Sequence, residues 1–300
     1  MTDRVEDRHC DVAQARPELL IRGTFVHLPG VGPRTEERLW RQGITSWSEF
    51  RALERIKGLS QARKAMLDKE LSSADEELAS GRVERLVGRF PYAELWRLYP
   101  MLEKGARFLD IETDGLSQSA VTTVAGISRP VMSDGRLDRL AHTALIRGQG
   151  LTRDSLAEAL KGATVLVTFN GSTFDLPVLR REFGEFLPKV PHIDLRHLSR
   201  KAGLTGGLKA LERRLGIVRD AEVQMLAGDD AVRLWRAWER KGHKRALELL
   251  VDYNREDAMN LSPLATILYK LMCMRQISKV RSVVGRPLPS RAADLVPGIF

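Results

Sequence analysis

Alternating apolar and polar residues predict a group of strands in the middle of the chain. Residues 106–113 read ARFLDIET, and side chains two apart in a strand share a face. Asp110 and Glu112 therefore fall on one face of this strand, with Leu109 and Ile111 on the other. Further strands are expected at residues 121–129, 139–146 and 163–169. The last of these is a continuous apolar run, which is typical of a strand covered on both faces.

Helical periodicity dominates the two ends of the chain. Residues 51–81 are expected to be helical, because their apolar residues recur on one face: Leu67, Leu71, Ala74 and Leu78. Helices are also expected at 151–162, 205–217 and 228–243, after Asp175, and in a long stretch from Lys244 that contains Pro263. Three strands, a helix, a strand and a helix predict an α/β fold with a sheet flanked by helices.

A glycine-rich turn, LPGVGP at Leu28–Pro33, interrupts the N-terminal helical region. An amphipathic helix follows and is expected to end at Gly43. Ser46 is the expected N-cap of a second short helix, with Glu49 as its capping-box partner.

This segment resembles a helix-hairpin-helix motif, in which the backbone of a Gly-x-Gly hairpin approaches a DNA phosphate. Gly30, Val31 and Gly32 occupy the matching positions. Glycine is expected there because the turn requires unusual backbone angles and leaves no side chain in the way. Two alternatives remain open: a plain turn between packed helices, or a hairpin that binds protein.

Charge and cysteine content narrow the class of protein. The formal net charge of +9 and the isoelectric point near 9.8 favour a polyanionic partner, with nucleic acid first and an acidic membrane surface second. Cys10 and Cys273 lack metal-ligand spacing, which excludes a disulfide scaffold or a zinc site. No apolar leader and no membrane-spanning stretch is visible, so we expect a cytoplasmic protein without a membrane partner.

Asp110 and Glu112 are the first candidates for chemistry. Two carboxylates on a buried strand are costly unless they are paired, and two like charges side by side raise the pKa of one or both. Oxygen ligands suit Mg²⁺ or Mn²⁺, which would remove this cost. The alternative is that both acids lie at the strand end, in solvent or paired with arginines.

Three segments resemble, in order, the motifs of the DEDD (DnaQ-like) exonucleases: FLDIETDGL (108–116), FNGSTFDLPVL (169–179) and YNREDAMNL (253–261). They are most similar to the proofreading exonuclease domain of family B DNA polymerases. Residues 106–272 as a whole resemble the YprB-like ribonuclease H-like proteins. Three ordered motifs are far more specific than one.

The resemblance implies a ribonuclease H-like mixed sheet and a two-metal site containing Mg²⁺ or Mn²⁺. Its four metal carboxylates would be Asp110, Glu112, Asp175 and Asp257. Tyr253 would orient the attacking water or help to deprotonate it. Asn170 and Phe174 match positions near the bound nucleotide, and Asp194 matches a frequent acid whose role the resemblance does not define.

These expectations combine into one organisation: a flexible N-terminus (1–16), a helix-hairpin-helix-like region (17–81), a connector (82–105), an exonuclease domain (106–275) and a basic, proline-containing tail (276–300). The expected activity is metal-dependent 3′-to-5′ hydrolysis of nucleic acid, with DNA preferred over RNA because of the hairpin. A structure-specific endonuclease and a non-catalytic nucleic-acid-binding module are the alternatives. The sequence does not identify a protein partner.

Overall fold

A computed structural model describes residues 17–284 of the chain, apart from residues 116, 118 and 227. The expected flexible segment 1–16 and the last part of the expected tail, 285–300, lie outside the described residues. Within the described part, no helix combines the length and the apolar character that crossing a lipid bilayer requires.

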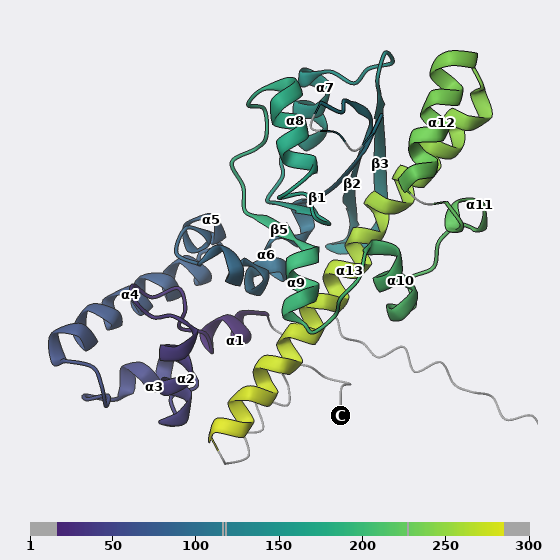
Figure 1. The fold of residues 1–300 in the computed structure, drawn as a ribbon. Helices are drawn as coiled ribbons and strands as arrows, with labels where there is room; N and C mark the ends of the chain where they lie inside the picture. The colour runs from purple at the N-terminus through teal and green to yellow at the C-terminus, as the bar shows by residue number, and fades with distance from the viewer. Residues whose placement is uncertain (1–16, 116, 118, 227, 285–300) are drawn as a thin grey trace, which may run out of the picture. The chain divides into compact units, whose positions relative to one another are not determined.

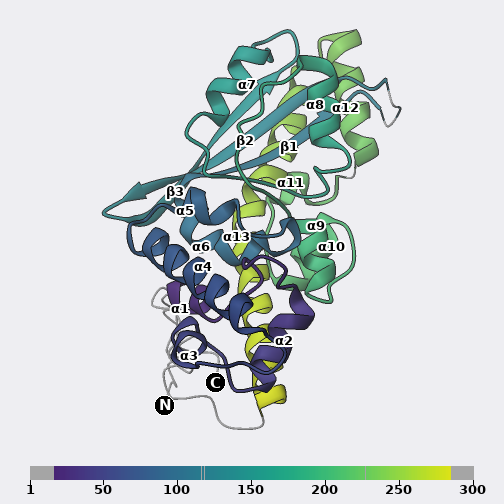
Figure 2. The same ribbon diagram turned by 90° about the vertical axis from the view of Figure 1, so that its left-hand side faces the viewer.

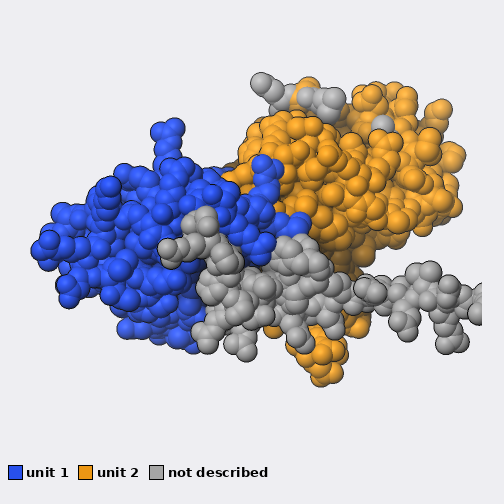
Figure 3. Space-filling view, turned by 90° about the horizontal axis from the view of Figure 1, so that it is seen from below, with its two compact units in different colours: residues 1–98, 273–300 blue, residues 99–272 orange. Residues whose placement is uncertain are grey.

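The chain divides into two compact units, which Figure 3 shows in different colours. Unit 1 comprises residues 1–98 and 273–300, and unit 2 comprises residues 99–272. The expected connector, residues 82–105, is therefore divided between the two units.

Unit 1 is helical in its described residues, as the sequence predicts. Its elements are α1 (Pro17–Arg22), α2 (Pro33–Arg41), α3 (Trp47–Ala52), α4 (Gln61–Ala79), α5 (Val83–Val87), the 3₁₀ helix η2 (Tyr92–Leu98) and the last turns of α13 (Lys244–Val284). The four apolar residues that define the expected helical face, Leu67, Leu71, Ala74 and Leu78, are all buried. Burial of that face is what holds α4 to the rest of the unit.

Serine hydroxyls cap two of these helices. The Ser60 hydroxyl accepts a hydrogen bond from the Arg63 amide (3.2 Å) at the start of α4. The Ser46 hydroxyl accepts one from the Glu49 amide (3.2 Å) at the start of α3. The carboxylate of Glu49 accepts from the Thr45 amide (2.7 Å) rather than from Ser46, so the capping box is displaced by one residue.

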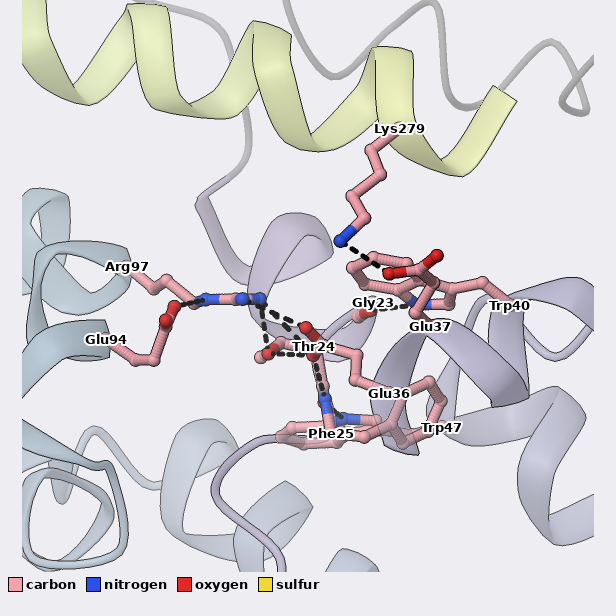
Figure 4. A network of polar contacts seen from close by, with 10 residues as sticks. All are labelled: Gly23, Thr24, Phe25, Glu36, Glu37, Trp40, Trp47, Glu94, Arg97 and Lys279. Carbon is pink, nitrogen blue, oxygen red and sulfur yellow. Dashed lines mark hydrogen bonds and ion pairs between the residues drawn. The ribbon is translucent and has the colours of Figure 1, made fainter. Parts of the chain in front are cut away.

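A buried polar network fixes the turn that precedes α2 (Figure 4). Glu36 is 1% exposed, and its carboxylate accepts from the Phe25 amide (2.7 Å) and the Thr24 hydroxyl (2.7 Å). Arg97 of η2 donates to the same carboxylate from Nη2 (3.0 Å) and to Glu94 from Nε (2.8 Å). Each charge of the network is thereby paired and hydrogen-bonded, as burial requires.

Unit 2 is built on a five-stranded mixed sheet. Its strands are β1 (Ala106–Thr113), β2 (Thr122–Ser133), β3 (Arg136–Ile146), β4 (Val165–Thr168) and β5 (His192–Asp194), in the order β3-β2-β1-β4-β5. The first three strands form an antiparallel meander, and β4 and β5 continue the sheet in parallel from β1. This confirms the expected α/β class with a mixed sheet.

Helices cover both faces of this sheet, as Figures 1 and 2 show. The helical elements of unit 2 are α6 (Tyr99–Leu102), η3 (Glu103–Gly105), α7 (Arg153–Leu160), α8 (Asp175–Phe183), α9 (Leu195–Lys201), α10 (Leu208–Leu215), α11 (Ala221–Gln224), α12 (Gly228–Lys241) and most of α13. On one face, Leu109 and Ile111 of β1 share an apolar cluster with residues of α7 and α8. On the other face, Val124 of β2 packs with Trp235 of α12 and Leu250 of α13.

The structure differs from the sequence-based expectations at several elements. Residues 53–60, expected as part of a helical stretch over 51–81, connect α3 to α4 and are not helical. Strand β5 was not predicted, because its three residues include two polar ones and are too few to show an alternating pattern. The expectation of a loose tail from residue 276 is wrong for 276–284, because α13 continues through Pro263 to Val284. Ile277 and Val280 are buried in these last turns, and Lys279 forms an ion pair with Glu37 (2.6 Å).

Candidate functional site

The central strand β1 presents two carboxylates on one face. Asp110 pairs with Gly126 of β2 and Glu112 with Val124, so both acids point to the side of the sheet that α13 covers. Leu109 and Ile111 point into the α7–α8 cluster, as the alternation predicts. A strand in the centre of a sheet is a rigid support, which fixes the separation of the two acids.

Helix α13 brings a third carboxylate, Asp257, to this pair. One oxygen from each of Asp110, Glu112 and Asp257 lies within 4.8 Å of the others. Glu112 and Asp257 are each 8% exposed. Three converging carboxylates are a suitable ligand set for a hard divalent cation such as Mg²⁺ or Mn²⁺.

Asp175, the fourth expected ligand, lies outside this group of three but next to it. It is the first residue of α8 and is 5% exposed. Its Oδ1 accepts a hydrogen bond from the amide of Ile111 (3.2 Å), the residue between the two acids of β1. The structure therefore gathers three of the four expected carboxylates and anchors the fourth to the same strand.

Burial and mutual repulsion disfavour ionisation of this cluster. Burial, then the charges of Asp257 and Glu112, raise the pKa of Asp110 well above its ordinary value. Burial, then the charge of Asp257, raise the pKa of Glu112 in the same way. Burial raises the pKa of Asp175 to about 7 and, against the opposing charge of Arg219, that of Asp257 to about 6. A divalent cation would offset this repulsion, so the residues present fit a metal site.

We therefore expect Mg²⁺ to raise the thermal unfolding midpoint more at about pH 8 than at about pH 6. The folded-state pKa values of Asp175 (about 7) and Asp257 (about 6) lie above the ordinary value of 3.8. Between about pH 4 and 7 the folded protein holds protons that the unfolded chain has lost, so these groups favour folding less as the pH rises. At the lower pH the metal must displace these protons, and at the higher pH it need not.

Thermal unfolding with and without Mg²⁺ at both pH values measures this difference. One buried and two half-buried histidines also titrate: desolvation lowers the pKa of His27 to about 3 and the pKa values of His142 and His192 to about 4. None of these histidines belongs to the group of converging acids, so they affect the curves with and without metal alike and their contribution cancels. An equal Mg²⁺ effect at both pH values would contradict a metal site formed by these acids.

An arginine that the sequence did not single out lies against Asp257. Arg219 comes from the segment between α10 and α11, and its side chain is 4% exposed. Its guanidinium pairs with Asp257 Oδ1 and makes two hydrogen bonds to Glu212, of which Nη2–Oε1 measures 2.8 Å. No motif marks Arg219, because the contact depends on how the segment after α10 folds back onto α13.

An asparagine next to the expected tyrosine supports the strand acids. Asn254 is fully buried, and its Nδ2 donates to Asp110 Oδ2 (2.9 Å) and to the Asp110 carbonyl (3.3 Å). A side chain at Gly126 of β2 would collide with the Asn254 amide. A glycine inside a β-strand pattern often marks a place where another group approaches the backbone closely. Gly126 was therefore the feature of the sequence that could have indicated this contact.

Tyr253 lies one turn before Asp257 on α13 and is 6% exposed. The Lys209 ammonium lies 4.3 Å from the centre of its ring. Burial, then the charges of Asp257 and Glu112, raise the pKa of the Tyr253 phenol above its ordinary value. The phenol is therefore neutral near pH 7, and its chemistry is that of a hydrogen-bond donor rather than a base.

Asn170 and Phe174 belong to the turn before α8, and Asp194, the last residue of β5, holds that turn through hydrogen bonds. The Asp194 carboxylate accepts from the amides of Asn170 (2.8 Å) and Ser172 (3.1 Å), and it also caps α9 by accepting from the Arg196 amide (3.0 Å). Asp194 thus has a structural task, which the sequence left undefined. Phe174 packs partly buried against the α7–α8 cluster. Contact of Asn170 and Phe174 with a nucleotide stays a prediction.

The glycine-rich hairpin belongs to unit 1, separate from the carboxylate group in unit 2. Gly30 has a φ of +66°, as the turn requires, and a side chain there would also collide with Arg63. Val31 is buried, and its amide donates to the Leu28 carbonyl (3.0 Å). Gly32 is extended, with φ −94° and ψ −179°, and a Cβ added to it would meet no atom within 4 Å. The expectation of unusual backbone angles is therefore correct for Gly30 and wrong for Gly32.

Comparison with known proteins places this site in a family. Residues 107–269 match the family model described as the RNase_H superfamily, and they include Asp110, Glu112, Asp175 and Asp257. No curated protein and no solved structure gives a significant match. The narrower resemblance to DEDD exonucleases stays a prediction. The family match covers more than half of the chain, and the mixed sheet with its converging acids agrees with it: the chain belongs to the RNase_H superfamily.

Proposed function

We propose that the protein hydrolyses nucleic acid as a metal-dependent 3′-to-5′ exonuclease with a preference for DNA. Membership of the RNase_H superfamily supports a nucleic-acid-cleaving function in general. The observation that carries the proposal is the convergence of Asp110, Glu112 and Asp257 within 4.8 Å. The order of the three motifs around these acids favours the exonuclease class within that family.

In this proposal the four acids hold two divalent cations, Mg²⁺ or Mn²⁺. Bound metals supply an activated water and offset charge on the attacking and leaving oxygens of the phosphodiester. Asp110 and Glu112 provide ligands from a rigid strand, and Asp257 provides one from α13. Asp175, whose Oδ1 accepts a hydrogen bond from the Ile111 amide, is proposed as the fourth ligand.

Tyr253 has an orienting task in this proposal. Its raised pKa keeps the proton on the phenol, so the side chain can donate a hydrogen bond to a water but is a poor proton acceptor. Of the two tasks that the resemblance implies, orienting the water is therefore favoured over deprotonating it. Lys209, near the ring, adds positive charge beside the acids.

The hairpin at Gly30–Gly32 is proposed to bind a phosphate of duplex DNA, which is the basis for preferring DNA. Gly32 precedes α2 in an extended conformation with open space around its Cα, so a ligand can approach its backbone. Val31 does not take part through its amide, since that group already donates to Leu28. A turn that binds protein remains the alternative.

Gly32→Val is expected to weaken duplex DNA binding about tenfold, or about 1.4 kcal/mol. A valine side chain would block the backbone without straining it, because Gly32 has no left-handed conformation and no close neighbour. Fluorescence anisotropy with a labelled duplex measures the affinity, and Gly88→Ala, a second glycine of unit 1 without a positive φ, is the control. Unchanged duplex affinity in Gly32→Val would make the hairpin a structural turn.

The exonuclease proposal is tested on a 5′-labelled single-stranded oligonucleotide with Mg²⁺, Mn²⁺ or a chelator. A ladder that shortens from the 3′ end and disappears with the chelator supports it. A single internal product would instead indicate a structure-specific endonuclease. Tight binding without cleavage of single-stranded, duplex or branched DNA, or of RNA, would indicate a non-catalytic module. Parallel RNA strands of the same sequence test the preference for DNA.

A further inference from the structure

The carboxylate site includes a positively charged side chain, that of Arg219, which pairs with Asp257. Arg219 is 4% exposed in its side chain, although the preceding Val218 is 84% exposed and lies at the surface. The segment therefore turns a long charged side chain inward while it leaves an apolar one in solvent. A guanidinium is costly to bury and needs charged partners, and here both partners are carboxylates.

The two partners of Arg219 differ in their relation to the metal site. Glu212 of α10 is 1% exposed and accepts two hydrogen bonds from the guanidinium, from Nε and from Nη2. Asp257, which belongs to the group of three converging acids, pairs with the same Nη2 through Oδ1. Glu212 thus fixes the orientation of the guanidinium, and the guanidinium holds one oxygen of Asp257.

We propose that Arg219 is a positioning residue that competes with a divalent cation for Asp257, and that Glu212 modulates this competition. The proposal rests on the metal binding proposed above, but not on the exonuclease activity. A metal that binds Asp257 must take a carboxylate whose Oδ1 is already engaged, and it must do so beside a positive charge. Like charges a few ångströms apart in a partly buried site repel strongly, so Arg219 should weaken metal binding.

The competition makes opposite predictions for the two partners. In Arg219→Gln the competing charge is gone, and we expect the Kd for Mn²⁺ to fall about tenfold. In Glu212→Gln, Arg219 loses its second carboxylate and pairs more fully with Asp257, so the Kd should rise about tenfold. A purely structural pair would shift both values in the same direction, because either change would disturb Asp257.

Isothermal titration with Mn²⁺ measures binding without reference to activity. Arg97→Gln is the matched control, because Arg97 forms a comparably buried pair with Glu36 and both residues belong to unit 1, whereas the carboxylates belong to unit 2. It should leave the Kd unchanged. Arg219→Lys keeps the charge and should stay within about threefold of the wild-type Kd. Circular dichroism of the metal-free variants shows which of them fold.

The results separate the inference from the proposed function. If the wild-type protein binds no Mn²⁺, both fail. If it binds Mn²⁺ but Arg219→Gln and Glu212→Gln both weaken binding, or neither changes it, the competition is overturned and the metal site stands. If Arg219→Gln does not fold, the pair Arg219→Lys and Glu212→Gln decides: a wild-type-like Kd for the first and a higher one for the second support the inference, and any other pattern overturns it.

Discussion

Asp110→Asn is expected to abolish hydrolysis while it stabilises the metal-free protein. The substitution removes a central metal ligand, and we expect the rate to fall at least about 10³-fold, or about 4 kcal/mol in the activation barrier. The same change removes a carboxyl group whose ionisation is disfavoured first by burial and then by the charges of Asp257 and Glu112. The thermal unfolding midpoint without metal should therefore rise. The two effects have opposite signs, which separates a lost ligand from a damaged fold.

Asp138→Asn is the control for this prediction. Asp138 lies on β3, is largely exposed, and pairs with its neighbour Arg139. Removal of its charge should change neither the cleavage rate nor the unfolding midpoint. Full cleavage by Asp110→Asn would exclude the metal-site assignment. A lower midpoint without metal would show that burial and repulsion of the Asp110 carboxylate do not destabilise the metal-free protein.

Glu36→Ala is expected to cost unit 1 about 3–5 kcal/mol of its free energy of unfolding. The carboxylate is 1% exposed and accepts from the Phe25 amide, the Thr24 hydroxyl and Arg97. Its removal leaves the Phe25 amide buried without an acceptor, and it leaves Arg97 with Glu94 as its remaining acidic partner. Chemical denaturation followed by circular dichroism measures the loss.

Glu37→Ala makes a close comparison, because it changes the same residue type one position along the same helix. Glu37 pairs at the surface with Arg41 and with Lys279 of α13. Solvent screens such pairs, so the unfolding midpoint should remain near that of the wild-type protein. Equal losses from Glu36→Ala and Glu37→Ala would show that helix propensity, and not the buried network, determines the effect.

The sequence was most informative where the signal is local. The two-residue period of β1 predicted which side chains share a face, and Asp110 and Glu112 do so opposite Leu109 and Ile111. The four-residue spacing of Tyr253 and Asp257 likewise placed both on one side of α13. Such periods follow from backbone geometry alone, which is why they can be derived without knowledge of the tertiary structure.

The contacts that the sequence could not predict join distant segments. Arg219 reaches Glu212 and Asp257 only because the segment after α10 folds back onto α13. Asn254 reaches Asp110 only because Gly126 leaves room for it. In each case the role of the residue depends on side chains that are far away in the sequence and close in the fold. Periodicity and short motifs describe only nearby residues, so they do not predict such contacts.

The hydrogen bond between Asn254 and Asp110 joins residues 144 positions apart. During synthesis the two acids of β1 therefore leave the ribosome long before α13 supplies Asp257. A nascent chain that has reached β4 contains most of the sheet but only part of the carboxylate group. Long-range contacts of this kind form late, because closing such a loop costs entropy. Until α13 has folded onto β1, the carboxylate group lacks Asp257 and the candidate metal site is incomplete.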